Sequence, residues 1–212
     1  MGNGAAIRGL YAIVDSSYIP PRDFAGAAGR IIEGGCGIIQ VRAKGLPAGE
    51  LVPFCLAVRR VTQGRGALLI VNDSVEAALA VGADGVHIGQ EDGSVGEARA
   101  ALGPGAIVGI STHSIDEALR AEAEGADYVS FGPIFPTRTK KDADAPKGLA
   151  ALRGLSGAVS VPVVAIGGID EKTAVEVLRA GASCAAMISE ILLGPEITAR
   201  VSSIVSSMAG EI

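Results

Sequence analysis

The feature that most constrains the fold of this chain is a repeated pattern in which a helical stretch ends in glycine and an apolar run follows. In each case the glycine is followed by alanine or cysteine. The four instances are Gly35 before 37–41, Gly82 before 85–88, Gly125 before 128–131 and Gly181 before 184–187. Glycine is typical of a helix end, because the residue after the last turn often takes a left-handed conformation. The pattern therefore predicts helices that each lead directly into a strand.

Four more apolar runs complete a regular alternation of strands and helices. They are 10–14, 67–71, 106–110 and 161–166. Stretches rich in Ala, Leu, Glu and Arg separate the runs, for example 115–124 and 172–180. Each run is continuously apolar, which indicates a parallel sheet covered by helices. Eight such strands in 212 residues predict an α/β fold, a single-domain (βα)8 TIM barrel over residues 1–212.

An open, doubly wound sheet is the rival arrangement. Its mark is a GxGxxG loop after the first strand, whereas here Val14 leads into Asp15-Ser16-Ser17. The repeat also recurs every second strand, which suits a barrel whose alternate strands fill alternate interior layers. We therefore expect a barrel with its active site at the carboxyl ends of the strands.

Composition and charge exclude several kinds of partner. A net charge of −5 and an aromatic content of 3% argue against nucleic-acid binding, which needs broad positive charge or stacking platforms. No apolar stretch approaches the roughly 18 residues of a membrane span, and the N-terminus lacks the order of a signal peptide. Three scattered cysteines without a CxxC predict buried free thiols in a reducing cytoplasm. We expect a cytoplasmic protein with small-molecule ligands; a homo-oligomer is compatible with the sequence, which leaves the oligomeric state open.

One group of polar residues at the strand ends is suited to a diphosphate and a metal. Arg42 and Lys44 share one face of the second strand if the chain stays extended there. Together with Lys140 they would face two acids, Asp73 and Asp92. Few hard oxygen ligands near cations suggest Mg²⁺ that bridges a diphosphate. Scattered histidines and cysteines lack the spacing of a soft-metal site.

Other roles for these polar residues stay open. Asp73 would serve equally as the N-cap of a helix over 74–81, and Asp92 would serve as a cap or a turn residue. His87 and His113 suit a hydrogen-bonded position at the barrel rim at least as well as an acid–base role. No Ser or Cys nucleophile beside a His and a further base is evident, so a covalent enzyme intermediate is not indicated.

A second group of residues is suited to a monophosphate. Gly167-Gly168 allows close backbone approach, and Ser189 would cap a helix with unpaired N–H groups. Loops after the seventh and eighth strands form the recurrent phosphate cradle of this fold. The loop over 131–141 adds hydroxyls and cations that suit phosphate oxygens. The alternatives are a plain strand-to-helix turn at Gly167-Gly168 and a solvated basic loop at 131–141.

Two anion sites suggest two substrates. Diphosphate is a leaving group, so the reaction would transfer the group that it leaves behind.

The strand-end residues resemble those of the thiamin phosphate synthase family over nearly the whole chain. The matching motifs, in order, are Tyr11-Ala-Ile-Val-Asp15, Gln40-Val-Arg-Ala-Lys44, Val71-Asn-Asp73, Asp84-Gly-Val-His-Ile-Gly-Gln-Glu-Asp92, Gly109-Ile-Ser-Thr-His113, Gly132-Pro-Ile-Phe-Pro-Thr-Arg-Thr-Lys140, Ala165-Ile-Gly-Gly-Ile169 and Met187-Ile-Ser189. The ordered set is highly specific, although each motif alone is weak. The resemblance implies condensation of hydroxymethylpyrimidine diphosphate (4-amino-2-methyl-5-diphosphomethylpyrimidine) with a (carboxy)methylthiazole ethyl phosphate to thiamin phosphate and diphosphate.

The resemblance also implies roles for individual residues. The pyrimidine diphosphate contacts would be Gln40, Val41, Arg42, Ala43, Lys44, Asn72, Ser111 and Lys140. The thiazole phosphate contacts would be Thr137, Arg138, Thr139, Gly168, Ile188 and Ser189. Asp73 and Asp92 would hold Mg²⁺.

The implied mechanism is dissociative, with Lys140, Ser111 and Arg42 as the catalytic residues. The cations and Mg²⁺ would stabilise the departing diphosphate, and the thiazole nitrogen would capture a pyrimidine carbocation. Preorganised electrostatics of this kind are usually the largest catalytic contribution. The chain departs from the family at Ser74, where an arginine is common, and at Val14, where threonine is frequent, and its N-terminal arm is short. These departures leave the chemistry intact but bear on rate and on contacts near the first strand.

Two rival functions share the predicted fold. A thiazole tautomerase paralogue would need a catalytic histidine but not the full set of cations and metal ligands. A non-catalytic phosphate-binding barrel would have no need to stabilise a leaving group. The presence of Lys140, Asp73 and Asp92 favours the synthase over both.

Overall fold

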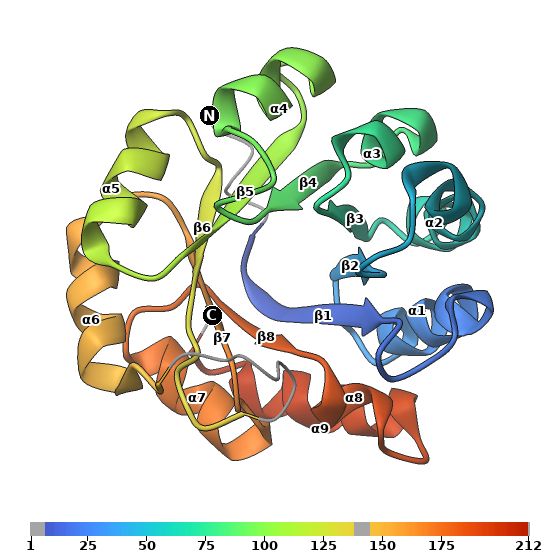
Figure 1. Cartoon of the computed structure of the whole chain (residues 1–212). Coiled ribbons are helices and arrows are strands. Elements are labelled where there is room, and N and C mark those ends of the chain that lie inside the picture. Colours follow the sequence, from blue (N-terminus) through green and yellow to red (C-terminus); the bar gives the residue numbers. More distant parts are fainter. Residues whose placement is uncertain (1–6, 138–144, 212) are drawn as a thin grey trace.

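The computed structural model describes residues 7–137 and 145–211, in which parallel strands form a closed barrel inside a ring of helices (Figure 1). Each strand pairs with the next along the chain, and β8 closes the barrel on β1. The strands are β1 (Gly9–Asp15), β2 (Ile38–Arg42), β3 (Leu68–Asn72), β4 (Gly85–Ile88), β5 (Ile107–Thr112), β6 (Tyr128–Phe131), β7 (Val163–Ile166) and β8 (Cys184–Met187). The predicted TIM barrel is confirmed, and the ends of its strands differ from the predicted runs by no more than two residues.

Helices cover the outer face of the barrel. They are η2 (Pro21–Asp23), α1 (Phe24–Glu33), α2 (Ala48–Gln63), α3 (Val75–Val81), α4 (Val95–Leu102), α5 (Ile115–Ala123), α6 (Gly148–Ala158), α7 (Glu171–Arg179), α8 (Ser189–Leu192) and α9 (Ile197–Met208). The glycines of the repeat have the predicted left-handed backbone, with φ of 100°, 59°, 89° and 101° at Gly35, Gly82, Gly125 and Gly181. The repeat therefore marks real helix ends.

The core has two parts because neighbouring residues of a strand point to opposite sides of the sheet. Leu10, Ala12 and Val14 of β1 pack outward with the helices. Tyr11 and Ile13 of the same strand point into the barrel. The barrel interior is thus a packed core with two tyrosines in it, one from β1 and Tyr128 from β6.

The three cysteines are buried free thiols, as predicted. Among the described residues, no helix has both the length and the apolar character needed to cross a bilayer.

The loops after β6 and β7 support each other at the carboxyl end of the barrel. Ile134 N donates to Ile166 O at 2.9 Å, and Phe135 N donates to Gly167 O at 3.0 Å. Gly167 and Gly168 have φ of 99° and 65°, and a Cβ on either would come within 2.5 Å of the segment before Thr137. Glycine is therefore required at both positions, because a side chain would clash with the loop after β6 and because the backbone has a positive φ.

Candidate active site

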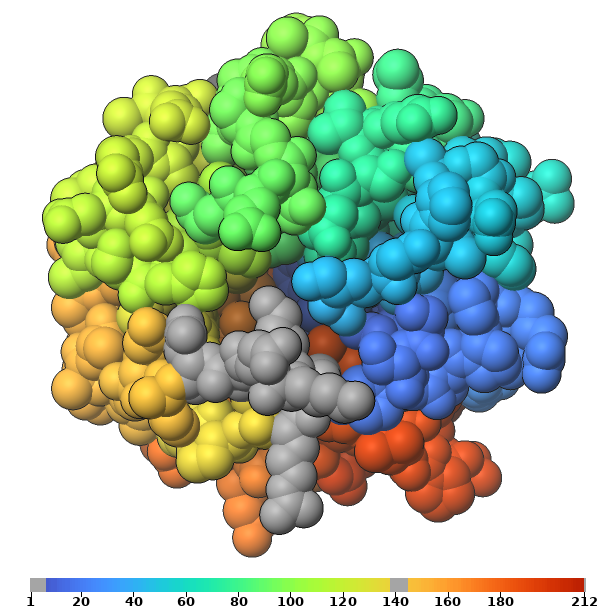
Figure 2. Space-filling model, viewed as in Figure 1, coloured from blue at the N-terminus to red at the C-terminus, as the bar shows by residue number. Residues whose placement is uncertain are grey.

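A cavity of about 410 Å³ opens at the carboxyl ends of the strands. Seen from the same side as Figure 1, the surface is hollowed toward the barrel axis between the blue and green segments (Figure 2). Of the residues predicted to form the site, those lining the cavity are Gln40, Arg42, Asn72, His87, Ser111, Thr137, Gly168, Ile188 and Ser189. The structure therefore brings together residues from the carboxyl ends of seven strands, β2 to β8.

The floor of the cavity is a buried hydrogen-bond network. Tyr11 and Tyr128 meet through their hydroxyls at 2.8 Å. Gln40 Nε2 donates to the Tyr11 hydroxyl at 3.0 Å. His87 forms a hydrogen bond through Nδ1 with the Tyr128 hydroxyl at 2.9 Å and another through Nε2 with Ser111 Oγ at 3.0 Å. Ser130 Oγ lies 3.4 Å from both His87 Nε2 and Ser111 Oγ.

His87 is therefore a hydrogen-bonded residue of the barrel interior. Its ring stacks on that of Tyr128, with centroids 5.4 Å apart and planes at 21°. His113 lies instead at the exposed edge of the cavity, where its backbone N donates to Glu117 at 2.7 Å.

Asp73 and Asp92 lie close together, near Lys44 and near Arg42, which lines the cavity; neither acid is itself among the lining residues. The pKa of Asp73 is raised from 3.8 to about 6, first by burial and then by the charge of Asp92 and a hydrogen bond with it. The charges of Arg42 and Lys44 act in the opposite direction. Two carboxylates this close favour a proton or a cation between them. The predicted convergence of Arg42 and Asp92 is confirmed.

The helix-cap alternatives for both acids are wrong. Ser74 is the N-cap of α3 and accepts from Ala77 N at 3.1 Å. Ser94 caps α4 in a capping box. Asp92 sits in a turn, where its Oδ2 accepts from Gly89 N at 2.9 Å, and Asp73 has a positive φ of 62°. Aspartate tolerates this left-handed conformation better than most residues, so Asp73 is held out of the helix.

Arg42 is held by a buried partner. Its Nη1 lies 2.6 Å from Oδ2 of Asp15, whose side chain is fully buried at the end of β1. Asp15 Oδ1 also accepts from Ser17 N at 2.8 Å. Because a buried carboxylate needs its partners, Asp15 restrains the guanidinium at the cavity wall.

The opposite side of the cavity is formed by the loop after β7 and the start of α8. Gly168, Ile188, Ser189 and Glu190 line it. The N-cap of α8 is Ile188, and Ser189 is the first helical residue; the prediction that Ser189 caps this helix is therefore wrong. Ser189 cannot act as the cap because the helix begins one residue earlier than the pattern suggested.

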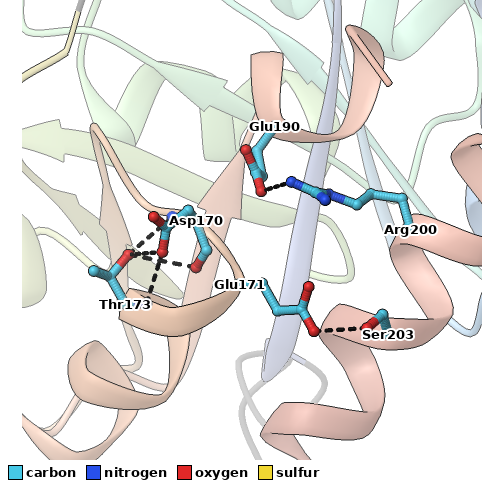
Figure 3. A network of polar contacts seen from close by, with 6 residues as sticks. All are labelled: Asp170, Glu171, Thr173, Glu190, Arg200 and Ser203. Carbon is cyan, nitrogen blue, oxygen red and sulfur yellow. Dashed lines mark hydrogen bonds and ion pairs between the residues drawn. The ribbon is translucent and has the colours of Figure 1, made fainter. Parts of the chain in front are cut away.

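An ion pair crosses from α9 to this side of the cavity. Figure 3 shows Arg200 reaching from α9 to Glu190 on α8, with which it is paired. The adjacent start of α7 is capped by Asp170, which accepts from Thr173 N at 2.8 Å, and Ser203 Oγ donates to Glu171 at 2.6 Å. These contacts tie α7, α8 and α9 together beside the cavity.

Some predicted site residues lie elsewhere. Val41 packs outward against the helices and Ala43 is buried, and neither side chain lines the cavity. Lys44 is exposed beyond the end of β2. Arg138, Thr139 and Lys140 lie outside the described residues.

Sequence reasoning missed several residues of the site. Tyr11, Tyr128 and Ser130 sit in apolar runs, where they read as core positions. Asp15 and Glu190 were not assigned a role. Alternation along β1 would have placed Tyr11 inside the barrel, but its contact with Tyr128 depends on closure of the whole sheet.

Comparisons with known proteins identify related chains. Residues 10–191 match the family model described as thiamine monophosphate synthase. The chain is 44% identical over 195 residues to the thiamine-phosphate synthase of Methanoculleus marisnigri, covering 92% of each chain. It is 46% identical over 191 residues to that of Anaeromyxobacter dehalogenans, covering 90% of this chain and 83% of the relative.

A solved structure is also similar over its full length. The thiamine phosphate pyrophosphorylase from Pyrococcus furiosus superposes with a TM-score of 0.90 at 36% identity, covering 99% of this chain and 100% of that one.

Proposed function

This chain belongs to the thiamine monophosphate synthase family, and on that premise we propose how its cavity serves the reaction. The chain is a transferase that condenses a pyrimidine diphosphate with a thiazole phosphate in thiamine biosynthesis. The observation that supports our assignment of the site is that Asp73 lies near Asp92, Lys44 and Arg42, and that Arg42 lines the cavity.

The region around Asp73 and Asp92 fits Mg²⁺ and the diphosphate. The described residues hold no cluster of three or more His, Cys, Asp or Glu side chains that could bind a metal by themselves. Mg²⁺ typically uses one or two carboxylates and takes its other ligands from substrate phosphates and water. Burial, and then the charge of Asp92, raise the pKa of Asp73, and a cation bound between the two carboxylates would offset both effects. Bound Mg²⁺ would supply charge to the leaving diphosphate, and Asp73 and Asp92 would hold it.

The reaction that this arrangement favours is dissociative. The bond between the pyrimidine methylene carbon and the diphosphate oxygen breaks, and the electron pair leaves with the diphosphate. Arg42, Lys44 and Lys140 stabilise the departing charge, and Ser111 donates a hydrogen bond to it. The thiazole nitrogen then gives its lone pair to the methylene cation, which forms the new carbon–nitrogen bond.

The thiazole phosphate would bind across the cavity, at Thr137, Gly168, Ile188 and Ser189. Thr137 and Ser189 supply hydroxyls, and Gly168 brings backbone without a side chain. The two substrates would thus enter from opposite walls and meet above the buried tyrosines.

Release of diphosphate from the two purified substrates tests this function. We expect Mg²⁺-dependent release that requires both substrates. The tautomerase and the non-catalytic barrel release none, so an absence of diphosphate with folded protein would contradict the proposal.

Arg200 is expected to neutralise the charge of Glu190, which lines the phosphate end of the cavity. Without its partner, the Glu190 carboxylate would face the bound phosphate as a bare like charge. Replacing Arg200 by methionine should raise the KM for thiazole phosphate about two- to fivefold, the size of an exposed ion pair. The KM for the pyrimidine diphosphate should not change.

A second substitution separates charge from structure. Adding Glu190→Gln to Arg200→Met removes the repulsion and should return the thiazole phosphate KM to near the wild-type value. A double variant as weak as Arg200→Met alone would mean that the ion pair acts by holding α8 in place.

A further inference from the structure

The buried tyrosines of the cavity floor take no direct part in the proposed reaction. Tyr11 and Tyr128 come from β1 and β6 and meet inside the barrel with ring centroids 6.0 Å apart. The fold makes room for them, because a Cβ on Gly109 would lie 2.0 Å from Cζ of Tyr128. Burial raises the pKa of both hydroxyls above the usual value. Each tyrosine therefore keeps one proton to donate.

The contacts of Tyr11 determine which group donates and which accepts at the Gln40 end of this hydrogen-bond network. Gln40 donates its Nε2 hydrogen to the Tyr11 oxygen. Among the described residues, the Tyr128 oxygen is the acceptor available to the Tyr11 proton. Since a fully buried hydroxyl proton without an acceptor is costly, Tyr11 donates to Tyr128.

The direction continues through His87. With its oxygen accepting from Tyr11, Tyr128 has His87 Nδ1 as the acceptor for its own proton. Nδ1 must then be unprotonated, and the ring carries its proton on Nε2. Nε2 donates to Ser111 Oγ at 3.0 Å. The chain thus runs from Gln40 through both tyrosines and His87 to Ser111.

Both ends of this chain open into the cavity. Gln40 Oε1 makes no hydrogen bond to a described residue. If this atom were fully buried it would be an unsatisfied buried oxygen, but among described residues only Ser156 Oγ is one. Gln40 Oε1 is therefore open to the cavity that Gln40 lines. Ser111 Oγ accepts from His87 and lies within reach of a proton from Ser130. Its own proton is therefore directed at the cavity.

We propose that Tyr11 and Tyr128 are positioning residues that fix Gln40 as a hydrogen-bond acceptor and Ser111 as a donor toward the pyrimidine diphosphate. This inference rests on the proposed function and names what selects the substrate. The Gln40 amide, held by Tyr11, presents Oε1 to the amino group of the pyrimidine. The Ser111 hydroxyl, held through His87, presents its proton to a diphosphate oxygen. The pair therefore selects a 4-aminopyrimidine over its 4-oxo analogue.

The tautomer of His87 tests the direction of this series of hydrogen bonds without any substrate. The protein has two histidines, so a His113→Gln variant assigns the remaining ¹⁵N imidazole signals of the full-length protein to His87. We expect a protonated Nε2 and an unprotonated, hydrogen-bonded Nδ1. In Tyr128→Phe the Nδ1 signal should move to the position of a nitrogen without a donor. A proton on Nδ1 in the wild-type protein would overturn the proposal, whether or not the enzyme is active.

Substrate selection tests the consequence of that direction. Tyr11→Phe leaves the Gln40 amide free to turn, so kcat/KM for the amino substrate should fall about tenfold. The preference for the amino over the oxo pyrimidine diphosphate should fall with it. Tyr18→Phe removes a hydroxyl from the remaining tyrosine, which does not line the cavity, and should keep the wild-type preference.

The two measurements also separate possible failures. A folded Tyr11→Phe enzyme that is slower but keeps the full preference would show that the tyrosine only supports the structure, which contradicts the proposal. If Tyr11→Phe does not fold, the His87 tautomer of the wild-type protein still decides the direction. Absence of turnover in the wild-type enzyme would refute the proposed function but not the assigned tautomer.

Discussion

Replacing Asp73 by asparagine is expected to lower turnover at least about 100-fold while making the metal-free protein more stable at neutral pH. The loss of activity follows because asparagine keeps the shape of Asp73 but removes a charged ligand of the proposed Mg²⁺. Loss of a direct metal ligand should lower activity at least as much as loss of a residue that only orients a ligand. The gain in stability follows from the crowding of Asp73 and Asp92.

The direction of the stability change follows from the pKa of Asp73. Folding raises it from 3.8 to about 6, so the folded protein holds this proton more tightly than the unfolded chain. The stabilising effect of the protonated form is complete below pH 3.8 and is lost as the pH rises through about 6. Above that pH the charged carboxylate destabilises the metal-free fold. Because Asp73 is half-buried, solvent screening reduces this effect to about 1–2 kcal/mol.

Thermal unfolding in EDTA between pH 4 and pH 8 measures the effect. At pH 8 the Asp73→Asn protein should melt about 2–8 °C above the wild type, and near pH 4 the difference should vanish. Adding Mg²⁺ with diphosphate should stabilise the wild type and not the variant. Asp116→Asn, an exposed change on α5, is the matched control. Equal melting temperatures at both pH values, or a variant that retains activity, would contradict the assignment.

The barrel could be predicted because its information is local. Continuous apolar runs, every second one preceded by a helix-ending glycine, can be recognised without knowledge of distant residues. The strands β4, β6 and β8 begin and end where the pattern placed them. The parallel strands also put their carboxyl ends at one mouth. The meeting of Arg42 and Asp92 follows from that geometry, although fifty positions separate them in the sequence.

The cavity floor could not be predicted in the same way. Tyr11 and Tyr128 are separated by 117 positions and belong to strands that do not pair. Their contact depends on how side chains fill the closed barrel and on the missing side chain at Gly109. Likewise the buried pair of Asp15 and Arg42 depends on the register between β1 and β2, which places these residues opposite each other. Periodicity reports which side chains point inward, but it does not report which of them touch.

Lys140→Ala is expected to lower kcat by about 10²–10³-fold, which corresponds to about 3–4 kcal/mol of transition-state stabilisation. The reason is the position of Lys140 in the chain, three residues after Thr137, which lines the cavity, together with the charge that develops on the departing diphosphate. An ammonium that interacts more strongly with the transition state than with the bound substrate changes kcat more than KM. Turnover should be measured as diphosphate release with both substrates saturating, and circular dichroism should show an unchanged fold.

Lys141→Ala is the control that makes this prediction specific to one lysine. It removes the same charge from the neighbouring position, so any general effect of lowering the positive charge of this loop should appear in both variants. If the proposed role is correct, Lys141→Ala should retain near-wild-type kcat, and Lys140→Arg, which keeps the charge but not the compact ammonium, should fall between wild type and Lys140→Ala. A Lys140→Ala enzyme within threefold of wild-type turnover would remove this lysine from the mechanism, and stabilisation of the diphosphate would then rest on Arg42, Lys44 and the metal.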